Sequence, residues 1–151
     1  MRDTNEEASM STSDLAEIIE QSHKALDSFA RGDPKPMREL YSQLDDVTLA
    51  NPFGPPALGR NQVAETMERA ASHYLEGEAT GFERISEYAT ADLAYIVEVE
   101  HWRSKVGGAD EISAFSLRVT TIFRREDGDW RIVHRHADPI TTTRSPESVL
   151  Q

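Results

Sequence analysis

The chain has 151 residues, a net charge of −11 and no cysteine. This length suits one domain with a sizeable core, and the lack of cysteine excludes disulfides, thiolate nucleophiles and sulfur ligands for zinc. The acidic balance argues against nucleic acid as a partner, because phosphate binding relies on clustered lysines and arginines. No apolar run approaches the roughly 20 residues that a membrane span needs, and no secretory signal is apparent, so we expect a cytoplasmic protein without a membrane partner.

The N-terminal half reads as helices. Residues 1–12 are polar and without periodicity, which predicts a disordered tail. Asp14 then caps a helix, with Glu17 three residues on as in a capping box, and Gly32 ends this helix. Apolar spacing predicts two further helices, over 34–44 and 61–75. The buried side of the second comprises Met37, Leu40, Tyr41 and Leu44.

The C-terminal half reads as strands. A short strand over 47–51 precedes the third helix, and four longer strands are predicted over 82–90, 93–105, 112–125 and 129–138, which are rich in β-branched and aromatic residues. Turn signals such as Gly107-Gly108 and Asp127-Gly128 separate them, which indicates an antiparallel meander. The order ααβαββββ predicts an α+β fold with helices on one face of a curved sheet. We expect one domain over 13–139 and a polar C-terminal tail over 140–151.

The last strand carries the most informative pattern. Strict alternation sends His134 and His136 to the same face as two apolar residues, Trp130 and Ile132. This face is typical of an apolar pocket with a titratable mouth, but core residues followed by histidines at a solvated strand end give the same pattern.

Two segments resemble a known family. Residues 47–60, with Asn51-Pro52-Phe53-Gly54, and residues 117–136, with Asp127-Gly128-Asp129-Trp130, are similar to the SnoaL-like branch of the NTF2-like superfamily. That superfamily includes ketosteroid isomerases, polyketide cyclases, scytalone dehydratases and binding domains. The resemblance covers about 14–139. It implies a cone-shaped half-barrel with three helices on a curved, mostly antiparallel sheet, a pocket between helices and sheet, and a homodimer formed through the outer face of the sheet.

The resemblance does not extend to the residues of steroid isomerisation. Asn51 stands where the ketosteroid isomerases have their catalytic Asp, and an amide cannot accept a proton at neutral pH. Ala25 stands where they have an oxyanion-hole Tyr, and the strand over 112–125 contains no acid. These departures argue against that mechanism.

Three polar residues are the catalytic candidates. His136 would act as general acid or base, and Arg118 would orient a carbonyl, enolate or carboxylate. Glu100 would pair with Arg118 across the strands or relay a proton, because a buried arginine without a carboxylate is costly. The alternative is a structural Arg118–Glu100 pair with His136 merely at a strand end. The pattern alone does not assign which strand faces line the cavity.

Four further residues are the ligand-binding candidates. Asn51 would donate a hydrogen bond to a ligand carbonyl, while Phe53, Tyr41 and Trp102 would form apolar walls. We expect no metal, because His134 and His136 supply two ligands at most, and no cofactor, because no glycine-rich nucleotide motif is present.

Two classes of function remain open. The protein is either a cofactor-free isomerase, dehydratase or cyclase acting on a small, mostly apolar carbonyl compound, or a non-catalytic module of the same fold that binds a small molecule or another protein. The lack of an Asp at position 51 favours the second class, and only residues inside the pocket can decide between them.

Overall fold

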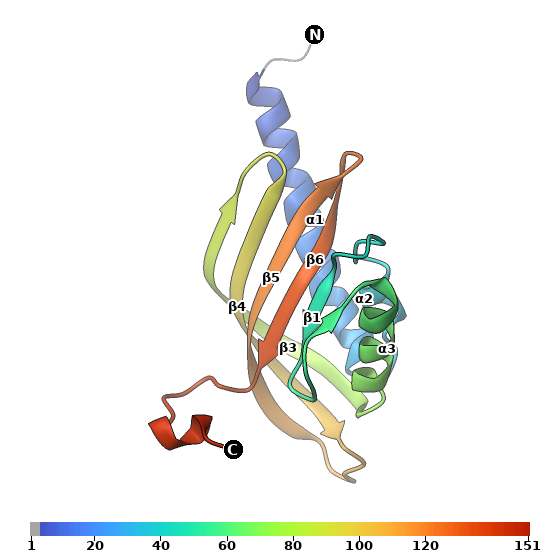
Figure 1. Ribbon diagram of the computed structural model, residues 1–151, viewed down its shortest axis with the longest axis vertical. Helices are drawn as coiled ribbons and strands as arrows, with labels where there is room; N and C mark the ends of the chain where they lie inside the picture. Colours follow the sequence, from blue (N-terminus) through green and yellow to red (C-terminus); the bar gives the residue numbers. More distant parts are fainter. Residues whose placement is uncertain (1–3) are drawn as a thin grey trace.

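The computed structural model describes the backbone of residues 4–151 and the side chains of residues 14–151. Its helices lie on one face of a curved, open sheet (Figure 1). The elements are α1 (Thr4–Phe29), α2 (Lys35–Arg38), β1 (Thr48–Ala50), β2 (Ala57–Leu58), α3 (Arg60–Ala71), β3 (Tyr74–Ala89), β4 (Leu93–Val106), β5 (Ser113–Glu126), β6 (Asp129–Asp138) and the 3-10 helix η1 (Pro146–Val149).

The fold is α+β, as predicted, and its sheet is mostly antiparallel. Strands β3 to β6 form the antiparallel meander, and β1 adds to it in parallel beside β6, giving the order β2-β1-β6-β5-β4-β3. The two-residue strand β2, inside the loop that follows β1, is the one addition to the expected order. Asp127 and Gly128 both have positive φ angles, 50° and 87°, which matches the tight turn expected of Asp-Gly in a hairpin.

The helices differ from the prediction at their ends. Helix α1 begins at Thr4, so Asp14 lies within the helix and does not cap it, and residues 4–12 are helical where we expected a disordered tail. Gly32, with a φ of 93°, follows the end of α1 as predicted. Leu44 is 55 % exposed and is not on a buried helix face, because α2 ends at Arg38. No described helix is both long and apolar enough to cross a bilayer.

Strand β3 is longer than predicted and strongly bent. It begins at Tyr74, eight residues before the expected start at residue 82, and its pairing with β4 shifts register at three places. Such irregularities bend a strand and increase its twist. The bend carries Tyr74 to Trp102 of β4, with ring centroids 5.3 Å apart, so the start of β3 becomes part of the concave side of the sheet.

A buried ion cluster fastens α1 to the sheet. Glu98 of β4, 3 % exposed, accepts hydrogen bonds of 2.8 Å from His23 Nε2 of α1 and from Arg84 Nε of β3. The His23 ring stacks on Phe82 with centroids 3.6 Å apart. Burial is the largest influence on Glu98 and raises its pKa, but the hydrogen bonds and charges of His23 and Arg84 together outweigh it and hold the pKa below its ordinary value.

This lowered pKa predicts an acid-sensitive contact. A carboxyl whose pKa is lower in the folded than in the unfolded state stabilises the fold above its unfolded pKa, and this stability is lost as pH falls through the folded pKa. We expect Glu98→Gln to reduce the free energy of unfolding by about 1.5–3 kcal/mol at pH 7, and by less in acid. Urea unfolding of both proteins at neutral and acid pH measures this difference. Glu20→Gln, at an exposed pair with Lys24, is the control; a gap that stays constant with pH would contradict the prediction.

Candidate functional site

A β-bulge in β6 decides which side chains face the concave side. Phe123 of β5 pairs with Ile132, whereas the preceding Ile122 pairs with His134, so Val133 is the extra residue. Alternation therefore restarts after Val133. Arg135 lies with the buried Ile132, and His134 turns to the outer face, where its Nδ1 lies 2.8 Å from Thr48 Oγ1.

Arg135 forms a buried ion pair with Glu100. Its Nη1 and Nη2 donate to Glu100 Oε2 and Oε1 at 2.8 and 2.7 Å, and Trp102 Nε1 donates to Glu100 Oε1 at 3.1 Å. Glu100 is 1 % exposed. Burial acts to lower the pKa of Arg135, but the charge and hydrogen bonds of Glu100 outweigh it and raise this pKa above its ordinary value. The buried guanidinium of Arg135 thus keeps its charge beside the Glu100 carboxyl group.

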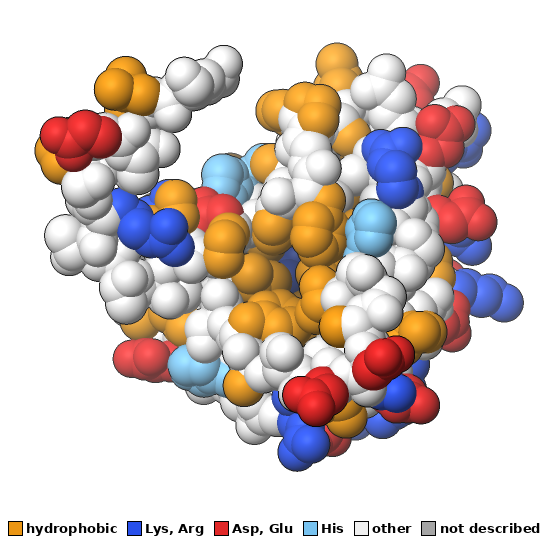
Figure 2. Space-filling model, turned by 90° about the horizontal axis from the view of Figure 1, so that it is seen from below, with side chains coloured by type: hydrophobic (Ala, Val, Ile, Leu, Met, Phe, Trp, Pro, Cys, Tyr) orange, Lys and Arg blue, Asp and Glu red, His pale blue; other side chains and the backbone are white. Residues whose placement is uncertain are grey.

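An apolar pocket opens next to this pair. Seen from below, the molecule has a hollow lined by hydrophobic side chains with a basic group at its bottom (Figure 2). Fifteen residues of the helices, β1, the loop after it and the sheet line the pocket: Leu26, Phe29, Met37, Tyr41, Leu49, Asn51, Pro52, Phe53, Met67, Ala70, Tyr74, Trp102, Leu117, Arg135 and Ala137. The cavity is small, with about 40 Å³ open to the centre of a water molecule.

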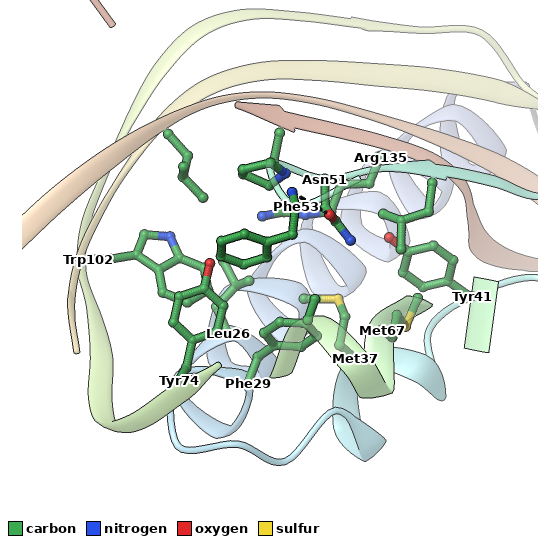
Figure 3. A pocket seen from close by; sticks show the side chains of 15 residues that line it. Leu26, Phe29, Met37, Tyr41, Asn51, Phe53, Met67, Tyr74, Trp102 and Arg135 are labelled. Atoms are coloured by element: carbon green, nitrogen blue, oxygen red, sulfur yellow. Dashed lines mark hydrogen bonds between the residues drawn. The ribbon is translucent and has the colours of Figure 1, made fainter. Parts of the chain in front are cut away.

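Aromatic rings form one end of the pocket. Tyr74 lies 5.8 Å from Phe53 and 6.1 Å from Phe29, measured between ring centroids. Figure 3 shows Phe53, Phe29, Tyr74 and Trp102 grouped at that end, with Tyr41 at the other. Burial raises the pKa of Tyr74 to about 12. Flat apolar walls of this kind suit a planar, mostly hydrocarbon ligand.

One hydrogen-bond donor in the pocket has no partner. The hydroxyl of Tyr41 is buried, and within the described part of the chain it makes no hydrogen bond. It points toward Asn51 and Arg135 (Figure 3). Burial, the largest influence, raises the pKa of Tyr41 far above its ordinary value, so this group donates a hydrogen bond but does not release its proton at neutral pH. A buried hydroxyl without a partner costs free energy, and such groups need an explanation.

Two other donors converge on the same place. The side-chain oxygen of Asn51 accepts a 2.9 Å hydrogen bond from the backbone N–H of Phe53, which leaves the amide NH2 as the group that Asn51 can offer. Arg135 has five N–H groups, of which Glu100 takes two. The pocket therefore presents N–H and O–H donors, and its described lining contains no histidine and no acid.

The structure brings together some predicted site residues and separates others. The four ligand-binding candidates, Tyr41, Asn51, Phe53 and Trp102, all line the pocket. Of the three catalytic candidates only Glu100 lies beside it. The expected Arg118–Glu100 pair is wrong, since Arg118 lies opposite Val99 while Glu100 lies opposite Leu117, which places the two side chains on opposite faces of the sheet.

Arg118 and His136 lie on the outer face. Both contact Asp138, at 2.7 Å from Arg118 Nε and 2.9 Å from His136 Nε2, and their side chains are 55 % and 51 % exposed. These contacts, with a hydrogen bond from the Ile140 N–H, outweigh burial and lower the pKa of Asp138. The side chains of Arg118 and His136 therefore do not reach the pocket, and the catalytic roles predicted for them are not supported by the geometry.

Arg135 is the site residue that the sequence prediction missed. One signal was available: the apolar face of β5, with Leu117, Val119 and Phe123, is the face that packs inward, and Arg118 is not on it. Glu100 therefore needed another cation. Strict alternation in β6 pointed Arg135 outward, and the bulge at Val133 reverses this.

Comparison with solved structures defines the class of fold. The chain is similar to an NTF2-like superfamily protein from Salmonella enterica serovar Typhimurium LT2, with a TM-score of 0.75, 16% identity, and 93% of this chain and 98% of that chain covered. A proposed scytalone dehydratase from Novosphingobium aromaticivorans gives a TM-score of 0.68 at 11% identity, covering 93% and 100%. A ketosteroid isomerase-like protein from Erwinia carotovora atroseptica gives 0.63 at 18%, covering 76% and 87%. The fold is NTF2-like.

The family follows from the sequence itself. A model of the SnoaL-like domain matches residues 17–141, which is most of the chain. The protein belongs to the SnoaL-like domain family. A comparison with curated proteins found no match. Because NTF2-like folds host many chemistries, the activity must be argued from the pocket.

Proposed function

We propose that this SnoaL-like protein binds a small, mostly apolar carbonyl compound in the pocket between α1, α3 and the sheet. The unpartnered Tyr41 hydroxyl carries the proposal, because a ligand oxygen that accepts its hydrogen bond removes the cost of leaving it unpaired. Asn51 and Arg135 supply neighbouring donors for the same oxygen.

The charge of the site favours a neutral carbonyl oxygen there. Glu100 already neutralises Arg135 through two charge-assisted hydrogen bonds. A carboxylate placed beside the pair would be repelled by Glu100 and would lose its hydration in an apolar hollow. A ketone or aldehyde oxygen loses little hydration and gains directed donors.

Binding requires the mouth of the pocket to open. The cavity volume of about 40 Å³ holds roughly three waters, less than an aromatic ketone occupies. Phe53 is the lining side chain that can move most easily, since it is 47 % exposed and lies on the loop between β1 and β2. Its ring contacts His73, 5.0 Å away between centroids, at the surface end of the pocket. Outward rotation of Phe53 would free the space against Tyr74 that its ring now occupies and so admit the ring of a ligand.

Tyr41→Phe tests the proposal with a matched pair of probes. Acetophenone and ethylbenzene have similar shapes, but only the first carries a carbonyl oxygen. We expect wild-type protein to bind acetophenone about tenfold more tightly than ethylbenzene, and Tyr41→Phe to abolish most of this preference. The free energy of unfolding of the variant should equal that of the wild type or exceed it by about 1 kcal/mol, because the substitution removes an unpaired buried hydroxyl. Titration calorimetry and urea unfolding measure the two effects.

The control is Tyr88→Phe, which removes a hydroxyl from an exposed ring outside the pocket. It should leave the preference for the ketone unchanged. Equal binding of the two probes by the wild type, or an unchanged preference in Tyr41→Phe, would refute the proposal.

Enolisation of the bound ketone is the second candidate function. The observation that favours it is the convergence of three donors where the oxygen of an enolate would sit, which is the arrangement that stabilises such an anion. The pocket offers no free base, because Glu100 is held by three hydrogen bonds. We therefore favour binding. Exchange of the methyl protons of acetophenone in D2O, followed by NMR with and without protein, separates the two candidates: protein-dependent exchange supports enolisation, and its absence supports binding alone.

A further inference from the structure

A second hollow lies directly behind the wall of the ligand pocket. It is bounded by α2, the segment after it, the start of β1 and α3, and about 260 Å³ of it is open to the centre of a water molecule, compared with about 40 Å³ in the first pocket. Tyr41 and Met67 line both hollows. These two side chains are therefore the partition between them, and Figure 3 shows both at the same end of the ligand pocket.

The partition contains one adaptable side chain. Met67 is 1 % exposed and packs between the hollows. Methionine has three rotatable bonds and fills irregular gaps, so it can adopt another rotamer at low cost. A different rotamer of Met67 would join the two spaces beside Tyr41.

The second hollow has an apolar floor and a basic rim. Its floor is formed by Tyr41, Val47, Val63 and Met67, all of them buried. Arg38 and Arg60 lie at the rim, and within the side chains of residues 14–151 neither guanidinium has a hydrogen bond or ion pair. Glu39 is also at the rim, so the rim keeps a net positive charge. Two arginines without an acidic partner over an apolar floor give an anionic end group of a ligand a place to pair, although the chain as a whole has a net charge of −11.

We propose that the second hollow is an extension of the ligand site, which holds an apolar arm ending in a carboxylate. The carbonyl of the ligand binds at Tyr41, the arm passes Met67, and the carboxylate pairs with Arg38 and Arg60. This inference rests on the proposed function and narrows it, from carbonyl compounds in general to oxo acids whose two oxygen functions are separated by a hydrocarbon chain. The two ends suit the two sites, since Glu100 disfavours an anion at the first and the arginines favour one at the second.

The experiment uses the full chain and two series of phenyl ketones. One series ends its alkyl arm in a carboxylate and the other in a methyl group, and the arm is lengthened one methylene at a time. Dissociation constants are measured by titration calorimetry. We expect the carboxylate to improve binding about threefold to tenfold once the arm reaches the rim, and to give no gain in shorter compounds. This gain should shrink when salt is raised, because the rim is solvent-exposed.

Variants identify the groups responsible. The double variant Arg38→Gln, Arg60→Gln should lose the gain from the carboxylate while binding the methyl-ended ketones as the wild type does. Both arginines are at the surface of the hollow, so the fold tolerates the change. Arg69→Gln is the matched control, because Arg69 is on α3 and does not line either hollow.

The outcomes separate this inference from the proposed function. A carboxylate gain that vanishes only in the double variant supports the extended site. Methyl-ended ketones that bind at Tyr41, with no carboxylate gain at any arm length or with a gain that the double variant retains, overturn the extended site and leave the proposed function standing. Failure of both series to bind overturns both.

Discussion

Glu100→Gln is expected to reduce the free energy of unfolding by about 3–5 kcal/mol, the largest effect that we predict for a single side chain. Glutamine keeps the shape of glutamate but loses its charge, so Arg135 becomes an uncompensated cation in a buried site. One amide oxygen also has to serve the donors that two carboxylate oxygens now accept from Arg135 and Trp102. Urea unfolding at neutral pH measures the change.

The double variant Glu100→Gln, Arg135→Met distinguishes the lost charge balance from lost packing. Removing both charged groups should recover much of the stability lost in Glu100→Gln, since a buried ion pair contributes little against apolar side chains of similar size. Glu126→Gln is a suitable comparison, because Glu126 also pairs with an arginine, Arg124, but closer to solvent. A loss in Glu100→Gln no larger than in Glu126→Gln would show that the buried pair does not depend on its charge.

Gly77→Ala is expected to destabilise the protein by about 1–3 kcal/mol, or more if the strand cannot shift. A Cβ atom at Gly77 would lie 2.5 Å from the backbone oxygen of Arg103 and 2.5 Å from Ser104 Cβ. This crowding occurs where β3 bends, and the Gly77 N–H there donates to the oxygen of Ala30 at 3.0 Å. The clash is with the backbone of β4, which has little freedom to move.

Thermal or urea unfolding measures the effect of Gly77→Ala. Gly54→Ala, at a glycine with nothing within 4 Å of the added carbon, is the control and should change stability little. Because the bend positions Tyr74 against Trp102, we also expect Gly77→Ala to weaken ligand binding even under conditions where the protein stays folded. Stability equal to that of the control would contradict the proposed crowding.

Much of the fold follows from local patterns in the sequence. The meander was predictable because Asp127-Gly128 and Gly107-Gly108 allow the positive φ angles that tight turns need, and because β-branched and aromatic residues fill the runs between them. The first residues of α1 and of β3 were harder to predict from the sequence. Residues 4–12 have no apolar face to signal a helix, and the first part of β3, from Tyr74 to Gly81, is interrupted by bulges that break its alternation.

The site was only half predictable, and the physical reason is the register of β6. Phe53, Trp102 and Tyr41 line the pocket as predicted, because they are large apolar groups that the sequence pattern placed in a loop, in a strand and on the buried side of a helix. The charged pair was misassigned because a bulge at a valine leaves no mark in the sequence, unlike one that needs glycine. The roles of the pocket residues remain proposals, and the homodimer and the domain boundaries at 13 and 139 remain predictions.

The extra residue in β6 has a consequence for how relatives of this protein are compared. If β6 paired regularly through Val133 with the same sequence, the side chains after this residue would change faces. The imidazoles of His134 and His136 would then face the hollow in place of the Arg135 guanidinium. Removing that one residue would instead straighten the strand and keep Arg135 where it is. An alignment gap at this position therefore carries more chemical meaning than most substitutions nearby. An activity known for one member of the family should therefore be inferred for another only when both have, or both lack, the inserted residue.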